Sequence, residues 1–391
     1  MSAIQRRVLR GTTFAAAVAM AYVGGLVTGV VGSREGAPPP EDVGIVGEAA
    51  ARIEARAARA VDRRQLERAA VEGMVHSLGD RWSSFYAPSE YTSFKAALDG
   101  SYTGVGLWLG RGSDGRVEVA GVRPDSPAAG ARIAPGDDLL GVGDRKVTGR
   151  SIDEVIALLR GPPGTTVQVT LRHDGDRRAV TLPRTTLSTE NVTVEKLEGE
   201  VLRIQVASFT RGVGRQVHEA LAQDPPAHQR GVILDLRGNP GGLLDEAVAV
   251  SSVFLDGGPV VSYESRDAGR HTLTAAAGGD SATPLVVLVD GDTASAAEIV
   301  TAAVQDRNRG VIVGSRTYGK GSVQQPDRLS DGSALQLTVG RYRTPSGRTI
   351  DGAGVEPDVL VDPANPPAVA ERRALEVLSG LFAALGTGER G

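Results

Sequence analysis

A serine and a lysine in the C-terminal half of the sequence have the chemistry of a nucleophile and its base. Ser295 follows the apolar run LVVLVDG and opens a predicted helix over residues 295–305. Lys320 lies in the glycine-rich segment YGKGSVQ. Removal from water disfavours the ammonium, so a buried lysine can accept a proton from a serine hydroxyl. The pair predicts a serine nucleophile that needs no histidine.

Gln324 is a candidate third member of this site. If residues 321–325 are extended, Lys320 and Gln324 face the same side of the chain, because side chains of a strand alternate. The amide could then orient the lysine amine by a hydrogen bond. Taken alone, Gln324 is better explained as an ordinary polar strand residue.

Backbone N–H groups near Ser295 are candidates for stabilising a developing negative charge. The segment DLRGNPGG, residues 235–242, ends one predicted strand and begins a helix. Gly241, Gly242 and the N–H of Ala296 could form an oxyanion hole there, beside a helix N-terminus. A tight strand–helix turn would also need glycine. Either Asp292 or Thr293 is expected to cap the helix that Ser295 opens.

Several other chemistries are excluded by composition and motif. The chain has no cysteine, which excludes disulfides and thiolate sites, and its net charge of −4 and aromatic content of 4% argue against nucleic acid. None of the five histidines stands in a zinc or triad motif. Residues 314–320, GSRTYGK, resemble a phosphate-binding loop, but Gly321 replaces the Ser or Thr that would hold magnesium. We expect no metal and no other cofactor.

The N-terminus has the pattern of an export signal. Arg6, Arg7 and Arg10 precede an uncharged stretch, residues 11–32, and a bilayer span takes about 20 residues. The arginines favour a cytoplasmic N-terminus and an extracytoplasmic body. We favour a single-pass signal anchor in the cell membrane over a cleaved signal peptide, which would leave the protein secreted.

The pattern of apolar residues predicts a mixed α/β, multidomain chain. After the cytoplasmic stub and anchor, residues 1–34, a linker and helical region is expected over residues 35–100, with Ser89 capping its last helix. Short strands and turns fill residues 101–186, with one helix capped by Ser151. Strands and helices alternate over residues 187–362, which is the α/β pattern. A helical tail, residues 363–391, closes the chain.

Several motifs in one order resemble the C-terminal processing peptidases, also called tail-specific serine proteases. They are GDRWSSFY, YTGVGL, LLRGPPGTTV, DLRGNPGG, TASAAEI, YGKGSVQ and YRTPSGRTIDGAGVEPD, and they cover about three quarters of the chain. The resemblance implies an embedded PDZ domain at residues 101–186, β-barrel-like in form. It implies a protease core at residues 187–362 with Ser295 as nucleophile, Lys320 as base and Gln324 as helper. The family usually has serine where Ala297 stands.

The implied PDZ domain gives the short-strand region a binding role. A glycine-containing loop of such domains binds a terminal carboxylate, and the peptide adds as a strand. We further predict that Arg160, at the end of the domain's helix, couples peptide binding to the protease core; favourable placement of a cation at a helix C-terminus is the alternative. The predicted binding loop consists of Tyr102, Thr103, Gly104, Val105, Gly106 and Leu107.

These observations predict an extracytoplasmic serine endopeptidase that recognises apolar C-terminal tails of proteins or peptides. An adaptor protein and a homodimer through the helical ends are further expectations. The alternatives are a catalytically inactive PDZ scaffold, which presents clients to another protease, and a membrane-tethered peptide receptor. The presence of Ser295, Lys320 and Gln324 together favours the enzyme.

Overall fold

A computed structural model describes residues 44–112, 115–173, 175–223, 230–266 and 269–388. The chain divides into two units, residues 1–70 and 71–391, and each is described by itself. The predicted membrane anchor lies outside the described residues. Within these ranges, no helix is both long and apolar enough to cross a bilayer.

The core of the C-terminal region is a six-stranded sheet in the order β10-β11-β12-β15-β16-β19. Neighbouring strands are parallel, except that β10 and β11 are antiparallel. β12 and β15 are buried along their whole length, as the continuous apolar runs predict. The strands are β10 (Val192–Leu197), β11 (Val201–Val206), β12 (Gly231–Asp235), β15 (Leu285–Val289), β16 (Val311–Gly314) and β19 (Val359–Leu360).

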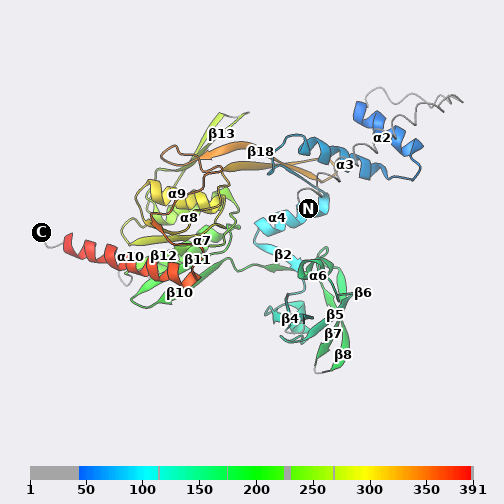
Figure 1. Ribbon diagram of the computed structural model, residues 1–391, viewed down its shortest axis with the longest axis horizontal. Coiled ribbons are helices and arrows are strands. Elements are labelled where there is room, and N and C mark those ends of the chain that lie inside the picture. The colour runs from blue at the N-terminus through cyan, green and yellow to red at the C-terminus, as the bar shows by residue number, and fades with distance from the viewer. Residues whose placement is uncertain (1–43, 113–114, 174, 224–229, 267–268, 389–391) are drawn as a thin grey trace, which may run out of the picture. The chain divides into compact units, whose positions relative to one another are not determined.

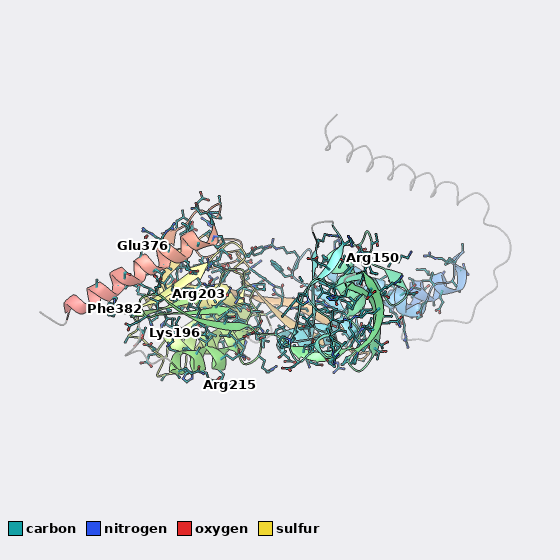
Figure 2. All side chains as sticks on the ribbon, turned by 90° about the horizontal axis from the view of Figure 1, so that it is seen from below. Arg150, Lys196, Arg203, Arg215, Glu376 and Phe382 are labelled. Atoms are coloured by element: carbon teal, nitrogen blue, oxygen red, sulfur yellow. The ribbon has the colours of Figure 1, made fainter. Side chains whose placement is uncertain are left out.

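Helices cover both faces of this sheet (Figure 1). On one face, α7 (Val213–Gln223), α8 (Leu244–Phe254) and α9 (Ala296–Asp306) share one apolar core with the sheet. On the other face, α10 (Pro367–Gly388) packs Ala374 and Leu378 against the strands. Figure 2 shows α10, with Glu376 and Phe382 labelled along it, running beside the sheet. The predicted α/β core is therefore a three-layer arrangement.

A second, antiparallel sheet lies beside the helix that Ser295 opens. Its order is β1-β18-β13-β14, and β17 also pairs with β18. One core cluster joins its side chains to Ile299, Ala302 and Ala303 of α9. The strands are β1 (Ser84–Tyr86), β13 (Pro259–Ser265), β14 (Gly269–Thr274), β17 (Ser322–Arg328) and β18 (Ala334–Arg343).

Residues 101–188 form a separate, mostly β, domain with its own apolar core. The short strands β2 (Ser101–Gly104) and β9 (Thr185–Ser188) pair with each other where the chain enters and leaves it. The predicted Ser151 cap is confirmed, since Ser151 Oγ accepts from Glu154 N at 3.2 Å. The sheet order is β3-β4-β5-β7-β8 with β6 beside β5, and the elements are β3 (Leu107–Arg111), β4 (Val117–Val122), α5 (Pro127–Gly130), β5 (Asp138–Val142), β6 (Arg145–Lys146), α6 (Ile152–Leu159), β7 (Thr166–His173) and β8 (Asp176–Pro183).

Helices dominate residues 44–100, as predicted, in the form of α2 (Ile45–Arg56), α3 (Arg63–His76) and α4 (Pro88–Leu98). The prediction that Ser89 caps the last of them is wrong. The helix begins one residue earlier, at Pro88, whose fixed φ suits a first helical position. Its N-cap is Ala87, and the Ala87 N–H donates to the Glu90 carboxylate at 2.7 Å.

Candidate active site

Ser295 has the backbone strain expected of a nucleophile on a sharp strand–helix turn. It is the N-cap of α9, with φ 55° and ψ −117°. A non-glycine residue in this region costs about 1–3 kcal/mol, and such residues cluster at functional sites. Neither Asp292 nor Thr293 caps the helix, contrary to prediction, because Thr293 Oγ1 donates to Leu236 O and accepts from Asp290 N.

Glu298 links the strained turn to the lysine loop. Its side chain is fully buried. One carboxylate oxygen accepts from the N–H groups of Ser295 and Lys320, each at 2.8 Å. The other accepts from Thr317 Oγ1 at 2.5 Å and from Gly319 N at 2.7 Å. Because the same carboxylate accepts from both backbones, it fixes the Lys320 loop relative to Ser295.

The amine of Lys320 lies on an aromatic ring. Its Nζ is 4.4 Å from the centre of the Trp82 ring. Burial lowers the pKa of Lys320 below the usual lysine value, which is the direction that a general base requires. Among the hydrogen bonds of the described residues, none joins Lys320 Nζ to Ser295 or to Gln324.

Gln324 lies in β17, and its amide bonds to residues other than Lys320. The Gln324 amide nitrogen donates to Ser322 Oγ at 2.7 Å and to Thr338 Oγ1 at 3.4 Å. The pairing of β17 with β18 shifts register between Val323 and Gln324. This irregularity interrupts the alternation from which we predicted a shared face with Lys320. The helper role of Gln324 stays a prediction.

The three candidate oxyanion donors differ in what surrounds them. The Gly241 N–H already donates to Asn239 Oδ1 at 2.8 Å, so in this conformation it cannot serve an oxyanion. Gly242 is exposed and Ala296 is the first residue of α9. For neither N–H does an acceptor occur within the described part of the chain. The geometry therefore favours Gly242 and Ala296 over Gly241 as donors.

Gly241 has a different requirement, which is close packing. A Cβ at this position would lie 2.8 Å from Ser295 Cβ and 3.0 Å from Ala296 N, and its φ is +101°. We therefore expect Gly241→Ala to displace the Ser295 turn. Proteolysis should fall at least about 100-fold, while tail-peptide binding to residues 101–188 stays unchanged. Parallel cleavage and calorimetric binding assays check this, and full activity would contradict it.

The predicted peptide-binding loop borders a pocket of about 770 Å³. Tyr102, Thr103 and Gly104 belong to β2 and Leu107 begins β3, so only Val105 and Gly106 form the turn between the two strands. β3 is the edge strand of its sheet, and the pocket separates it from Ile156 and Leu159 of α6. An edge strand with a neighbouring groove is the arrangement that admits an added peptide strand.

Arg160 also lines this pocket, as the exposed C-cap of α6. Arg184, rather than Arg160, hydrogen-bonds to the last carbonyl groups of α6. Its guanidinium donates to Leu159 O at 2.8 Å, to Leu158 O at 3.2 Å and to Thr166 O at 2.9 Å. Within the described residues no such bond is made by the Arg160 side chain, so its position leaves it accessible to a ligand.

Sequence reasoning missed three residues of this site, namely Glu298, Trp82 and Asn239. Asn239 is buried, donates to Val206 O at 2.7 Å and accepts from Gly241, so it holds the glycine turn. An acidic residue three positions after an N-cap serine is a capping-box signal, and it could have identified Glu298. Trp82 carries no comparable signal, because its contact with Lys320 joins distant segments.

Comparisons with known proteins identify two families to which segments of this chain are similar. The sequence profile of the PDZ domain matches residues 102–183, and that of peptidase family S41 matches residues 200–361. The carboxy-terminal processing protease CtpA of Bacillus subtilis (strain 168) is 32% identical over 295 residues, which are 75% of this chain and 63% of that protein. A solved photosystem II D1 C-terminal processing protease is 30% identical, with a TM-score of 0.52. The match covers 82% of this chain and 92% of the solved one.

Proposed function

The chain belongs to peptidase family S41, the carboxy-terminal processing proteases, and carries a PDZ domain; from this premise we propose that it is an endopeptidase with a Ser295–Lys320 mechanism. The observation that carries the proposal is the strained Ser295 turn, which Glu298 ties to the Lys320 loop. The strained backbone of Ser295 persists only if the surrounding structure stabilises it, and the hydrogen bonds of Glu298 to the Ser295 and Lys320 N–H groups provide that stabilisation.

The proposed reaction passes through an acyl-enzyme. Ser295 Oγ attacks the scissile carbonyl carbon, and its proton moves to the neutral amine of Lys320. The N–H groups of Gly242 and Ala296 stabilise the oxyanion. Lys320 then gives the proton to the leaving amine as the C–N bond breaks. Water attacks the ester next, loses its proton to Lys320, and the proton returns to Ser295 as the acid product leaves.

We propose that Gln324 orients the Lys320 amine once that amine has turned toward Ser295. Such an orienting group is the third member of a nucleophile–base system. In the present conformation the Gln324 amide nitrogen donates to Ser322 Oγ. A change of its rotamer would release it for this role.

The PDZ domain is proposed to bind the apolar C-terminal tail of a protein or peptide substrate. The groove between β3 and α6 supports this, because Leu107, Ile156 and Leu159 supply apolar lining. Gly106 has φ +83°, and a Cβ there would lie 2.2 Å from Ser126 Cβ. The shape of the loop beside the groove therefore requires glycine at this position.

Cleavage of an unfolded protein with an apolar C-terminus tests the proposal. The full chain should cut it, cut the same substrate more slowly when its last residues are charged, and leave it intact as the Ser295→Ala variant. If the parent protein binds the tail but never cuts, the chain is a PDZ scaffold and the protease proposal fails. If Ser295→Ala cuts as fast as the parent, the nucleophile is misassigned.

Arg160 is proposed to couple tail binding to proteolysis, since it lines the peptide groove at the end of α6. We expect Arg160→Ala to cut a tail-less substrate at the parent rate. Stimulation of that cleavage by an added apolar tail peptide should fall about tenfold. Arg150→Ala, an exposed cation of the same domain that contacts Glu154, is the matched control (Figure 2). Equal stimulation of both variants would remove Arg160 from this role.

We also propose that the body lies outside the cytoplasm, tethered by residues 11–32. The uncharged stretch and the preceding arginines support this placement. Protease digestion of intact and opened cells tests this placement. We expect added protease to reach the body without opening the cytoplasmic membrane. A body that is digested only after that membrane is opened would contradict the proposal.

A further inference from the structure

Trp82 is the aromatic residue on which the Lys320 amine lies, and it comes from a distant part of the sequence. It belongs to the segment GDRWSSFY, which the proposed mechanism does not use. Besides Lys320 Nζ at 4.4 Å, the Trp82 ring meets Tyr318 edge-on, with ring centres 6.1 Å apart. Tyr318 and Lys320 lie on the same loop, so the indole packs against the loop that carries the base.

A chain of hydrogen bonds fixes Trp82 in this place. Trp82 N donates to Asp80 Oδ1 at 3.0 Å, and Ser83 Oγ donates to Asp80 Oδ2 at 2.6 Å. Thr338 N in β18 donates to Ser83 Oγ at 3.0 Å. The next residues form β1, which pairs with β18 from Ser84 onward. The same Thr338 accepts from the Gln324 amide. The segment around Trp82 and Ser83 therefore contacts Lys320 directly and is linked to Gln324 through Thr338.

The ring treats the two protonation states of the amine differently. The face of an indole attracts a cation, with about 0.5–1 kcal/mol at partly exposed sites, and has no such attraction for a neutral amine. We propose that Trp82 is a positioning residue for Lys320, and that its indole ring binds the protonated amine whenever that amine is not bonded to Ser295. The inference rests on the proposed function, because it assigns the resting position of the proposed base.

Two consequences follow for the catalytic cycle. When the Lys320 amine loses its proton, its attraction to the indole ring weakens. The neutral amine is then free to turn and accept from Ser295 Oγ. Return of the proton restores the attraction to the ring. The bulk of Trp82 acts in the opposite sense, because it keeps water from the amine and so disfavours the ammonium.

The other charged and titratable groups near this contact are few among the described residues. Arg81 lies over the same indole, with its guanidinium carbon 4.6 Å from the ring centre. Hydrogen bonds from Ser83 and the Trp82 N–H hold the pKa of Asp80 below its usual value although burial would raise it. Glu298 meets Lys320 at the backbone N–H. On the loop beside Gly321, Asp351 is paired with Arg341 at 3.0 Å, and Tyr318 is exposed.

Tryptophan fluorescence tests the contact between the Lys320 ammonium and the Trp82 ring without any need for proteolysis. The chain has only two tryptophans, so Trp108→Phe leaves Trp82 as the single indole emitter. In the full chain with Ser295→Ala and Trp108→Phe, the emission should titrate with a midpoint below the usual lysine value, because burial lowers the pKa of Lys320. Adding Lys320→Met should abolish that titration. Identical titrations with and without Lys320 would overturn the inference, whether or not the parent protein is a protease.

The pH profile of proteolysis gives a second test with opposite expected signs. Trp82→Leu keeps an apolar cover but removes the ring, so the acid limb of kcat should move down by about half a pH unit. Trp82→Ala admits water to the amine, and its limb should move up. Trp82→Phe keeps a smaller ring, and its limb should lie between those of the parent and Trp82→Leu. Variants that lose rate at all pH values without any shift would show a purely structural role and contradict the proposal.

Discussion

The Lys320→Arg variant is expected to keep its fold and lose proteolytic activity by a factor of about 1,000. An arginine retains the positive charge and stacks on Trp82 as lysine does. Its guanidinium cannot release a proton at any pH that the protein tolerates, so it cannot act as the base for Ser295. Single-turnover cleavage of the tailed substrate, with melting curves of both proteins, separates chemistry from stability.

The same residue sets the direction of the pH dependence of the parent enzyme. Only the neutral amine accepts the Ser295 proton, so activity falls as the pH falls through the pKa of Lys320. Burial lowers that pKa, so the limb should lie below the usual lysine value of about 10.4. The Lys320→Met variant provides the matched control, since it removes the amine and keeps the apolar stem. Residual activity of Lys320→Arg with an unchanged acid limb would show that another group is the base.

The layered core was predictable because its signals are local. The runs that became β12, β15 and β16 are almost continuously apolar, β11 alternates its apolar residues with Arg203 and Gln205, and the helices between the strands follow the apolar period. Ser151 was predictable as a cap from its own neighbours. The start of α4 was not, because Pro88 and Glu90 together outweigh the hydroxyl of Ser89.

The candidate site was predictable only in its residue types. Ser295 and Lys320 stand in local motifs, but the position of the lysine amine depends on Trp82, from a segment that β1 attaches to β18. The orientation of Gln324 depends on a register shift between β17 and β18. Contacts between distant segments and irregular strand pairing leave no periodic signal in the sequence. Glu298 is intermediate, since its capping-box spacing is local but its bonds to Thr317 and Gly319 are not.

Glu298→Gln is expected to lower activity about 100-fold and to lower the free energy of unfolding by about 2 kcal/mol. The glutamine carbonyl can accept from one pair of donors, either Ser295 N and Lys320 N or Thr317 and Gly319. Its NH₂ group then faces the other pair, so two buried donors lose their acceptor. Thermal melting and kcat measured on the same preparation check both effects.

The balance between these two effects distinguishes what Glu298 does. Glu376→Gln, an exposed pair with Arg373 on α10, is the matched control and should change neither quantity. If Glu298 only supported the fold, activity would fall in proportion to the folded fraction and would recover on cooling. Because the carboxylate holds the backbone of both Ser295 and Lys320, we expect the fully folded variant at low temperature to remain slow. The reason is that a displaced base lengthens the path of the proton, and positioning errors of about 1 Å cost about 100-fold in rate.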